Sequence, residues 1–209
     1  MFKHIHIVAC SPRSGTTLLH EVMVTCFRTD KHYDHEVRFN LVSAEDGQIL
    51  ITKRPKDTMY MPAVLDDDPE LYVVYVLRDP RDVICSRHGK DKSMYYSNIR
   101  LYRELHDCAK KMYGHERFLE LRYEDFVRDP DATQKLIQDK FPWLEKTHDF
   151  SEYHEYAQVS AKSVTAMLIH LLQQEDQLHV DEPVATCIPD FARRRKHSIT
   201  IRDVLTHRA

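Results

Sequence analysis

The sequence predicts an α/β domain of three layers, with a central parallel sheet of four to five strands flanked by helices. Four short apolar runs, rich in β-branched and aromatic residues, are separated by helix-like stretches, which is typical of parallel strands joined by crossovers. The third run is apolar without alternation, as expected for a central strand covered on both faces. The four predicted strands are residues 5–10, 49–52, 71–77 and 118–121.

The predicted helices follow from spacing and capping signals. Asp79-Pro80 and Asp129-Pro130 each place a capping carboxylate before a proline at a first helical position. One helix carries apolar residues at spacings of three and four, a stripe that indicates a core-facing side. That stripe consists of Ile99, Tyr102, Leu105, Ala109 and Met112, and we expect helices over 16–27, 80–89, 95–113, 130–140 and 160–174, with a loop over 175–189.

Composition excludes several classes of protein. A length of 209 residues suits one α/β domain. The 30 Lys and Arg residues nearly balance the 33 Asp and Glu residues, giving a net charge of −3 and no bulk signal for nucleic-acid binding. The apolar runs are far shorter than the ~20 residues of a membrane span, and the N-terminus does not resemble a signal peptide, so we expect a cytoplasmic protein.

Histidine is abundant, with 14 residues, and invites a metal hypothesis. His4 and His6 would share one face of the first strand, but two residues fall short of the three or four ligands of a zinc site. We therefore expect satisfied or surface histidines and no metal site.

The segment Cys10–Thr17 predicts an oxyanion cradle between the first strand and the first helix. A strand that breaks at Pro12 and restarts as a helix near Gly15 leaves backbone N–H groups without partners, and these favour a phosphate or sulfate. Gly15 permits close approach of the anion and Arg13 adds a positive charge. The nearest general template is the P-loop G-x-x-x-x-G-K-[ST], so the expected fold is like that of P-loop NTPases. Cys10 replaces the first glycine and Thr16 the lysine, which weakens an ATP or GTP assignment.

Two further segments accompany the cradle. S-P-R-S-G-T-T-L-L at 11–19, Y-V-L-R-D-P-R-D-V-I-C-S-R at 75–87 and L-R-Y-E-D-F-V-R-D-P at 121–130 together resemble the sulfotransferases that use 3'-phosphoadenosine 5'-phosphosulfate (PAPS). In form they are most similar to tyrosylprotein, carbohydrate and bacterial sulfotransferases. The resemblance implies one sulfotransferase-like domain over 1–209, with a divergent C-terminal part at 145–209.

The resemblance also implies which residues bind PAPS and its product, adenosine 3',5'-bisphosphate (PAP). Arg78 and Ser86 match the arginine and serine that hold the 3'-phosphate, and Arg78 follows the central strand, where open α/β sheets bind ligands. Lys90 matches a further basic contact and Tyr123 a contact with the nucleotide. The cradle residues matching the loop for the 5'-phosphosulfate are Pro12, Arg13, Ser14, Gly15, Thr16, Thr17 and Leu18.

Sulfuryl transfer is an in-line displacement in which the acceptor loses a proton and the leaving phosphate gains charge. Arginine, lysine and backbone donors suffice for this charge, so no metal is expected. Lys53 matches the lysine of the family motif K-x-H-x-P, where Pro55 stands at the histidine position. The catalytic residues that the resemblance implies are therefore Lys53 and Arg13, with the general base supplied elsewhere.

Glu36-Val37-Arg38 resembles the E-x-R segment of tyrosylprotein and carbohydrate sulfotransferases. It implies that Glu36 is the general base and that Arg38 positions the acceptor or the sulfuryl group. His32 and His35 are alternative bases, and His35 is also a candidate contact with the substrate. Surface charge is the competing interpretation of the segment.

Several questions stay open at this point. The late R-x-G or G-x-W element of many sulfotransferases is missing, and the cluster Arg193–Lys196 is either its replacement or a solvated tail. A P-loop nucleotide kinase and a non-catalytic relative that binds PAPS or PAP are the alternative functions. The acceptor is a hydroxyl or amine of a small molecule, carbohydrate, lipid or peptide, and residues 28–48 and 145–190 are expected to bind it. The oligomeric state is not predicted.

Overall fold

The computed structural model describes residues 2–86, 95–157, 179, 181–187 and 198–201. The chain divides into two compact units, Met1–Ser86 with Tyr95–Gln158, and Arg87–Met94 with Val159–Ala209. The units are described separately below, and the single domain over 1–209 stays a prediction.

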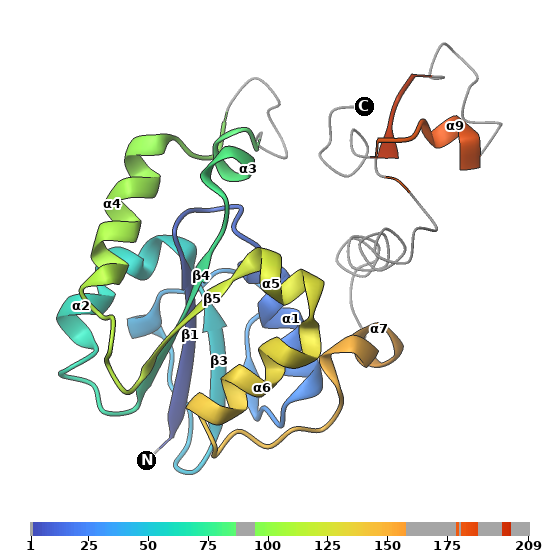
Figure 1. Cartoon of the computed structure of the whole chain (residues 1–209). Coiled ribbons are helices and arrows are strands. Elements are labelled where there is room, and N and C mark those ends of the chain that lie inside the picture. Colours follow the sequence, from blue (N-terminus) through green and yellow to red (C-terminus); the bar gives the residue numbers. More distant parts are fainter. Residues whose placement is uncertain (1, 87–94, 158–178, 180, 188–197, 202–209) are drawn as a thin grey trace. The chain divides into compact units, whose positions relative to one another are not determined.

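The first unit is built on a five-stranded parallel sheet of order β2-β3-β1-β4-β5 (Figure 1). The central strand β1 pairs with β3 on one side and with β4 on the other. This confirms the predicted α/β class and all four predicted strands, while the two-residue strand β2 was not predicted. The strands are β1 (Lys3–Ala9), β2 (Lys31–His32), β3 (Ile49–Lys53), β4 (Leu71–Leu77) and β5 (Phe118–Arg122).

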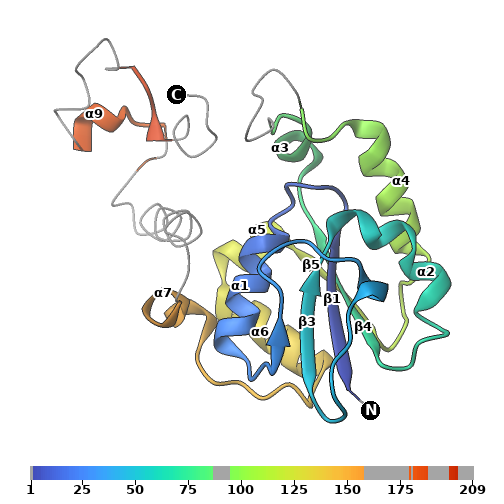
Figure 2. The ribbon, with the colours of Figure 1, turned by 180° about the vertical axis from the view of Figure 1, so that it is seen from behind.

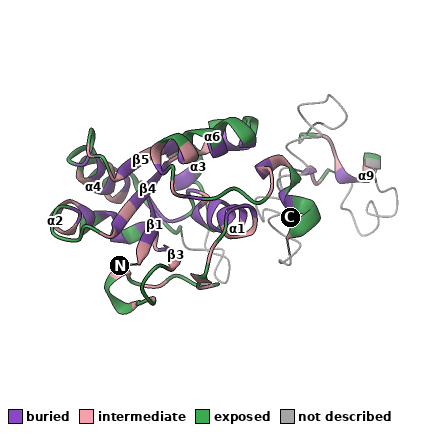
Figure 3. Ribbon diagram, turned by 90° about the horizontal axis from the view of Figure 1, so that it is seen from below, coloured by how far each residue is buried: buried purple, intermediate pink, exposed green. Residues whose placement is uncertain are grey.

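Helices cover both faces of this sheet. α1, α5 and α6 lie on one face, and α2 and α4 on the other (Figures 1 and 2). Their buried sides face the strands (Figure 3). The helices of this unit are α1 (Thr16–Cys26), α2 (Met61–Val64), α3 (Pro80–Ile84), α4 (Ile99–Lys110), α5 (Tyr123–Arg128), α6 (Pro130–Lys140) and α7 (Tyr153–Tyr156), with 3₁₀ turns η1 (Phe39–Leu41), η2 (Pro55–Met59) and η3 (Phe150–Glu152).

Most predicted helices are present: α6 has the predicted bounds, and α1, α3 and α4 are shorter than predicted. α3 ends at Ile84 instead of continuing to residue 89, and residues 87–89 lie outside the described part of the chain. α4 begins at Ile99 because Asn98 caps it by accepting from the Leu101 N–H. The predicted helix over 160–174 lies outside the described residues, whereas α2 and α5 were not predicted.

The core on the α2 and α4 face combines alternate residues of β1 and β4 with the predicted stripe of α4. Tyr102, Leu105, Ala109 and Met112 are buried, whereas Ile99, the first residue of the helix, is 45% exposed. The stripe is therefore a packing surface, as its spacing predicts. The cluster that it joins includes Val8, Cys10, Met61, Leu65, Leu71, Val73, Tyr75, Val83 and Phe118.

The same face of β1 also carries two buried histidines. His4 Nε2 and His6 Nδ1 lie 2.6 and 2.7 Å from the hydroxyl of Thr52, and His6 Nε2 lies 3.3 Å from the carboxylate of Asp57. These contacts fit the expected satisfied histidines. Within the described ranges, no three His, Cys, Asp or Glu residues are grouped to hold a metal ion.

The described residues of the second unit form a small local structure. α9 (Val184–Cys187) follows an antiparallel bridge between Pro183 and Thr200, and the Ile201 N–H donates to the carbonyl of Glu182. The predicted loop over 175–189 is wrong for the four residues of α9. Among the helices that the structure describes, none is long and apolar enough to cross a membrane.

The turn from β1 into α1 depends on left-handed backbone. Arg13 has φ 75° and Gly15 has φ 89°, a region that non-glycine residues adopt at a cost. A Cβ on Gly15 would lie 2.3 Å from two ring carbons of Tyr123, at the start of α5. Glycine is therefore required here both by conformation and by the approach of this ring.

Stability should fall in mildly acidic solution because three buried histidines are neutral in the native state. Burial lowers the pKa of His4 and of His20 to about 3 and also lowers the pKa of His6. The unfolded chain binds these protons below its ordinary pKa of about 6.5, so stability is complete above that pH and is lost as the pH falls. We expect a loss of roughly 1 kcal/mol per histidine between pH 7.5 and 5.5, measured by urea unfolding.

A matched pair of variants tests this assignment. His20→Leu should flatten the dependence by about a third, because it removes one of three protons. His35→Gln, which changes an exposed side chain, should leave the dependence as it is. Equal stability at the two pH values would contradict the assignment.

Gly15→Ala should destabilise the protein by more than the cost of its backbone conformation. Gly47→Ala is the matched control, since Gly47 has φ 83° but no atom within 4 Å of an added Cβ. We expect the control to cost about 1–2 kcal/mol and Gly15→Ala distinctly more in thermal or urea unfolding. Tyr123→Ala should recover part of the difference in the double variant. Equal costs at the two glycines would show that the ring does not constrain the turn.

Candidate functional site

The site lies where the chain reverses its direction across the sheet. From β1 the chain passes to β3 on one side, and it then crosses to β4 on the other side of β1. Because α1 and α4 cover opposite faces of the sheet, the chain leaves the carboxyl ends of β1 and β4 toward opposite faces (Figure 1). Open α/β sheets bind their ligands at such a switch point.

The loop after β1 is held from the inside by its own polar groups. The hydroxyl of Ser14 donates to the carbonyl of Ser11 over 2.8 Å and lies 3.1 Å from Cys10 Sγ. Among the described residues no side chain caps the N-terminus of α1, where Gly15 is the N-cap. The Ser14 hydroxyl therefore supports the loop, and the backbone N–H groups at the start of α1 stay available to an anion.

The remaining cradle residues lie where the sequence predicts the turn and the first helical turn. Pro12, Thr16 and Leu18 are buried, and Arg13 and Thr17 are exposed. The exposed guanidinium and the exposed hydroxyl are thus the cradle side chains most accessible to a ligand.

Arg13 and Arg78 link the two loops. Arg13 Nε donates to the hydroxyl of Ser86 over 3.0 Å, and Arg78 Nη1 donates to the Arg13 carbonyl over 3.1 Å. Ser86 lies two residues after α3, whereas the sequence predicts it within the helix. The aromatic ring of Tyr96 lies 5.7 Å from the Arg13 guanidinium. The structure thus brings together the residues predicted to hold both phosphates.

Arg78 has capacity for a further acceptor. Its guanidinium lies 4.2 Å from the ring centroid of Tyr123 and 3.8 Å from the carboxylate of Asp82. The Nε atom is buried and makes no hydrogen bond to any residue that the structure describes. A buried donor without an acceptor is costly, so this atom suits an anion bound between the loops that follow β1 and β4.

Two residues that support Arg78 were missed by the sequence analysis. The hydroxyl of Tyr102 donates to the Arg78 carbonyl over 3.0 Å, and Glu124 Oε1 accepts from the Asp79 N–H over 2.9 Å. Glu124 stands inside the third motif, so the motif itself marks it. Tyr102 was predicted only as a core residue of the apolar stripe on the helix over 95–113.

Lys53 and Glu36 come together at the carboxyl end of β3. The Val37 N–H donates to the Lys53 carbonyl over 3.2 Å, which fixes the segment of Glu36 beside the lysine. Lys53 is only 3% exposed, and its Nζ donates to the Asp34 carbonyl over 3.4 Å. Burial lowers the pKa of Lys53, and the nearby charges of Glu21, Glu36 and Asp34 oppose that shift. Lys53 is therefore not a solvated surface lysine.

The other candidate residues between β2 and β3 are exposed and have different neighbours. Glu36, His35 and Arg38 are exposed, and the His35 ring lies 6.1 Å from that of Tyr33. His32, at the end of β2, lies 3.7 Å from Asp34 Oδ1. Arg38 is the N-cap of η1 and lines a pocket with Asp57. Lys90 and the cluster 193–196 lie outside the described residues.

Comparison with family models gives two matches. The model described as "Sulfotransferase family" matches residues 23–143, which begins within α1 and ends after α6. A model described as "Beta-lactamase" matches residues 160–209, which contain none of the site residues described above.

Solved structures with similarity to the chain include a retinol dehydratase and a sulfotransferase domain. Retinol dehydratase in complex with androsterone and the inactive cofactor PAP is 15% identical, with a TM-score of 0.41, and the match covers 80% of this chain and 64% of that chain. The sulfotransferase domain from the curacin biosynthetic pathway is 14% identical, with a TM-score of 0.41 and coverage of 85% and 99%. The chain thus spans 64% of the length of retinol dehydratase. No curated protein sequence matches the chain.

The family match extends over more than half of the 209 residues and contains Arg78, Ser86 and Tyr123, together with Glu36 and Lys53. On the strength of that match, this chain belongs to the sulfotransferase family.

Proposed function

We propose that the chain transfers a sulfuryl group from PAPS to a hydroxyl or amine acceptor. The observation that carries the proposal is the linked pair of arginines in the loops that follow β1 and β4. Arg13 contacts Ser86, Arg78 contacts the Arg13 carbonyl, and the buried Arg78 Nε has no acceptor among the described residues. Such donors suit the two phosphate-bearing ends of PAPS.

The residues present fit this donor in two respects. The first respect is the start of α1, which follows the left-handed Gly15 and has no side-chain cap among the described residues. Its backbone N–H groups can therefore bind one anion, and we propose that this anion is the 5'-phosphosulfate. Arg78 and Ser86 supply the charge and the hydroxyl that a 3'-phosphate needs, with Lys90 and the cluster 193–196 as further candidates. We also propose that residues 1–209 form one functional unit, with a divergent part at 145–209.

We propose that Glu36 removes the proton of the acceptor and that Lys53 stabilises the negative charge on the leaving group. Glu36 takes the proton of the acceptor, whose oxygen or nitrogen forms a bond to sulfur as the bond from sulfur to the bridging oxygen breaks. Lys53 donates a hydrogen bond to that bridging oxygen, which receives the electron pair, and Arg13 balances the charge of the transferring group. His32 and His35 are the alternative bases.

Binding of PAP tests the donor site. We expect magnesium-independent binding by calorimetry, and Arg78→Gln should weaken it roughly 10- to 100-fold, since a hydrogen bond to a charged group contributes 1.5–3 kcal/mol. Arg81→Gln is the matched control, because Arg81 is an exposed neighbour that pairs with Asp79. Failure of the wild-type protein to bind PAP would overturn the donor assignment, and magnesium-dependent binding of ATP would favour a nucleotide kinase.

Turnover tests the roles of Glu36 and Lys53. With radiolabelled PAPS and a panel of phenols, sugars, lipids and tyrosyl peptides, Glu36→Gln should lower transfer by about 10²- to 10⁴-fold and leave PAP binding intact. Lys53→Met should also lower transfer. The control Glu45→Gln changes an exposed carboxylate further along the same connection and should have no effect. Wild-type turnover in Glu36→Gln would assign the base elsewhere, and His35→Gln and His32→Gln would then distinguish the alternatives.

Absence of transfer to every acceptor, with PAP binding retained, would instead identify a non-catalytic relative. The two measurements therefore separate an enzyme from a binding protein.

A further inference from the structure

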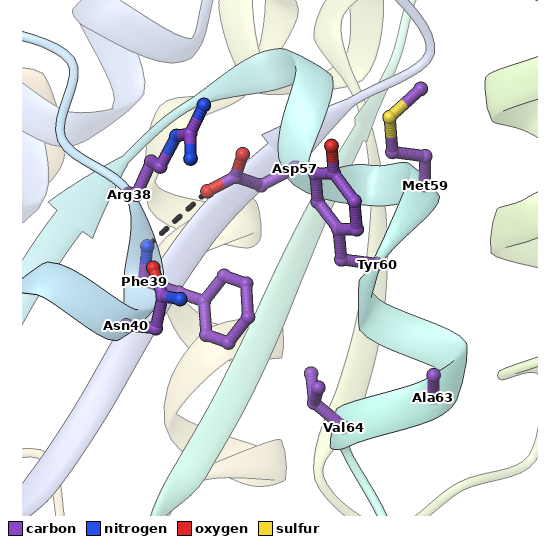
Figure 4. A pocket seen from close by; sticks show the side chains of 8 residues that line it. All are labelled: Arg38, Phe39, Asn40, Asp57, Met59, Tyr60, Ala63 and Val64. Atoms are coloured by element: carbon purple, nitrogen blue, oxygen red, sulfur yellow. Dashed lines mark hydrogen bonds between the residues drawn. The ribbon is translucent and has the colours of Figure 1, made fainter.

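A pocket that none of the donor-site residues lines opens beside the end of β3. Its volume is about 290 Å³, and its walls come from η1, η2 and α2 (Figure 4). This volume is at the low end of the range for small-molecule sites, so it suits a compact ligand of about one ring. The lining residues are Arg38, Phe39, Asn40, Asp57, Met59, Tyr60, Ala63 and Val64.

Hydrogen bonds between side chains and backbone anchor this pocket to the cradle. The hydroxyl of Thr58 accepts from the Ala9 N–H over 3.1 Å and lies 2.8 Å from the Ala9 carbonyl, so η2 is attached to the residue before Cys10. The Phe39 N–H donates to Asp57 Oδ2 over 3.2 Å, which joins η1 to η2 across the pocket floor. The pocket therefore lies at the same carboxyl edge of the sheet as the cradle.

The charges of the pocket favour an anion. The carboxylate of Asp57 is buried and already accepts from Arg54 Nη1 over 2.9 Å, while His6 Nε2 lies 3.3 Å away. The guanidinium of Arg38 is exposed and has no hydrogen bond or ion pair with any residue that the structure describes. The charge left without a partner is thus positive, and it suits a carboxylate or a similar group.

The rest of the pocket lining is mostly apolar and aromatic. The side chains of Phe39 and Tyr60 lie on opposite sides of the pocket, with Val64 and Ala63 below them (Figure 4). Met59 and Tyr60 are 44% and 48% exposed, a high value for large apolar side chains. An aromatic ring bound between these side chains would cover them.

We propose that this pocket binds the acceptor, and that the acceptor is a small hydroxyaryl compound with an anionic group that Arg38 recognises. The proposal rests on the proposed function, since only a sulfuryl acceptor needs to bind next to the cradle. The pocket is too small to hold the surface of a folded polymer. The Arg38 guanidinium would repel an aromatic compound that carries a charged amine.

Three phenols that differ in charge test the proposal. Calorimetry on the protein with bound PAP compares 4-hydroxyphenylacetate, neutral 4-ethylphenol and cationic tyramine. The anion should bind roughly 10-fold or more tightly than 4-ethylphenol, because its contact with Arg38 is charge-assisted, and tyramine should bind most weakly. Arg38→Gln should abolish the preference for the anion.

Two control variants complete the experiment. Arg103→Gln removes an exposed arginine on α4 that does not line the pocket, and it should retain the preference. Ala63→Trp fills the pocket from an exposed position and should prevent binding of all three phenols. Equal binding of the three compounds, or a preference that survives Arg38→Gln, would overturn the proposal.

Titration of PAP alone keeps this result separate from the donor site. Loss of the phenol preference with normal PAP binding counts against the pocket and leaves the proposed function intact. An Arg38-dependent preference without PAP binding supports the pocket as an anion site and counts against the donor assignment.

Discussion

The position of one aromatic ring determines how the three loops of the site meet. The ring of Tyr123 leaves no room for a Cβ on Gly15 and lies against the guanidinium of Arg78. It therefore contacts the loops that follow β1 and β4 while standing at the end of β5. Because Arg78 in turn donates to the Arg13 carbonyl, the left-handed turn and the arginine that faces it are fixed by the same packing.

A second constraint is the burial of charge at the end of β3. A lysine that is nearly inaccessible to water needs compensation, and here a carbonyl and three neighbouring carboxylates supply it. This arrangement keeps the ammonium of Lys53 in place without a direct ion pair, so its donors are not all used by the protein. Glu36 at its side is exposed, so solvent can reach the residue proposed as the base.

Strands and motifs were predictable from the sequence, whereas the shape of the loops was not. The apolar runs that became β1, β3, β4 and β5 are continuous because parallel strands are buried on both faces. β2 has only two residues, too few for periodicity, and α2 and α5 have four and six. No helix was predicted at the third motif, yet Tyr123 begins α5, whose Glu124 accepts a hydrogen bond from the residue after Arg78.

The pocket was also beyond prediction, for a different reason. Its residues come from two short 3₁₀ turns and a four-residue helix, and their juxtaposition depends on one buried carboxylate, Asp57, that contacts Phe39, Arg54 and His6. Tertiary contacts of this kind leave no periodic signal in the sequence. Arg38 was identified only through a motif, which indicated contact with the acceptor or the sulfuryl group but not the chemistry of the ligand.

Transfer in line demands that donor and acceptor be held with a precision of about 1 Å. In this fold the cradle begins directly after Ala9, and the same residue binds η2 through the hydroxyl of Thr58. A movement of β1 would thus carry both the cradle and the pocket with it. The relative position of the two proposed binding sites is therefore set by hydrogen bonds between the Thr58 side chain and the backbone of β1, and the long side chains of Arg38 and Lys53 need only make the final adjustment.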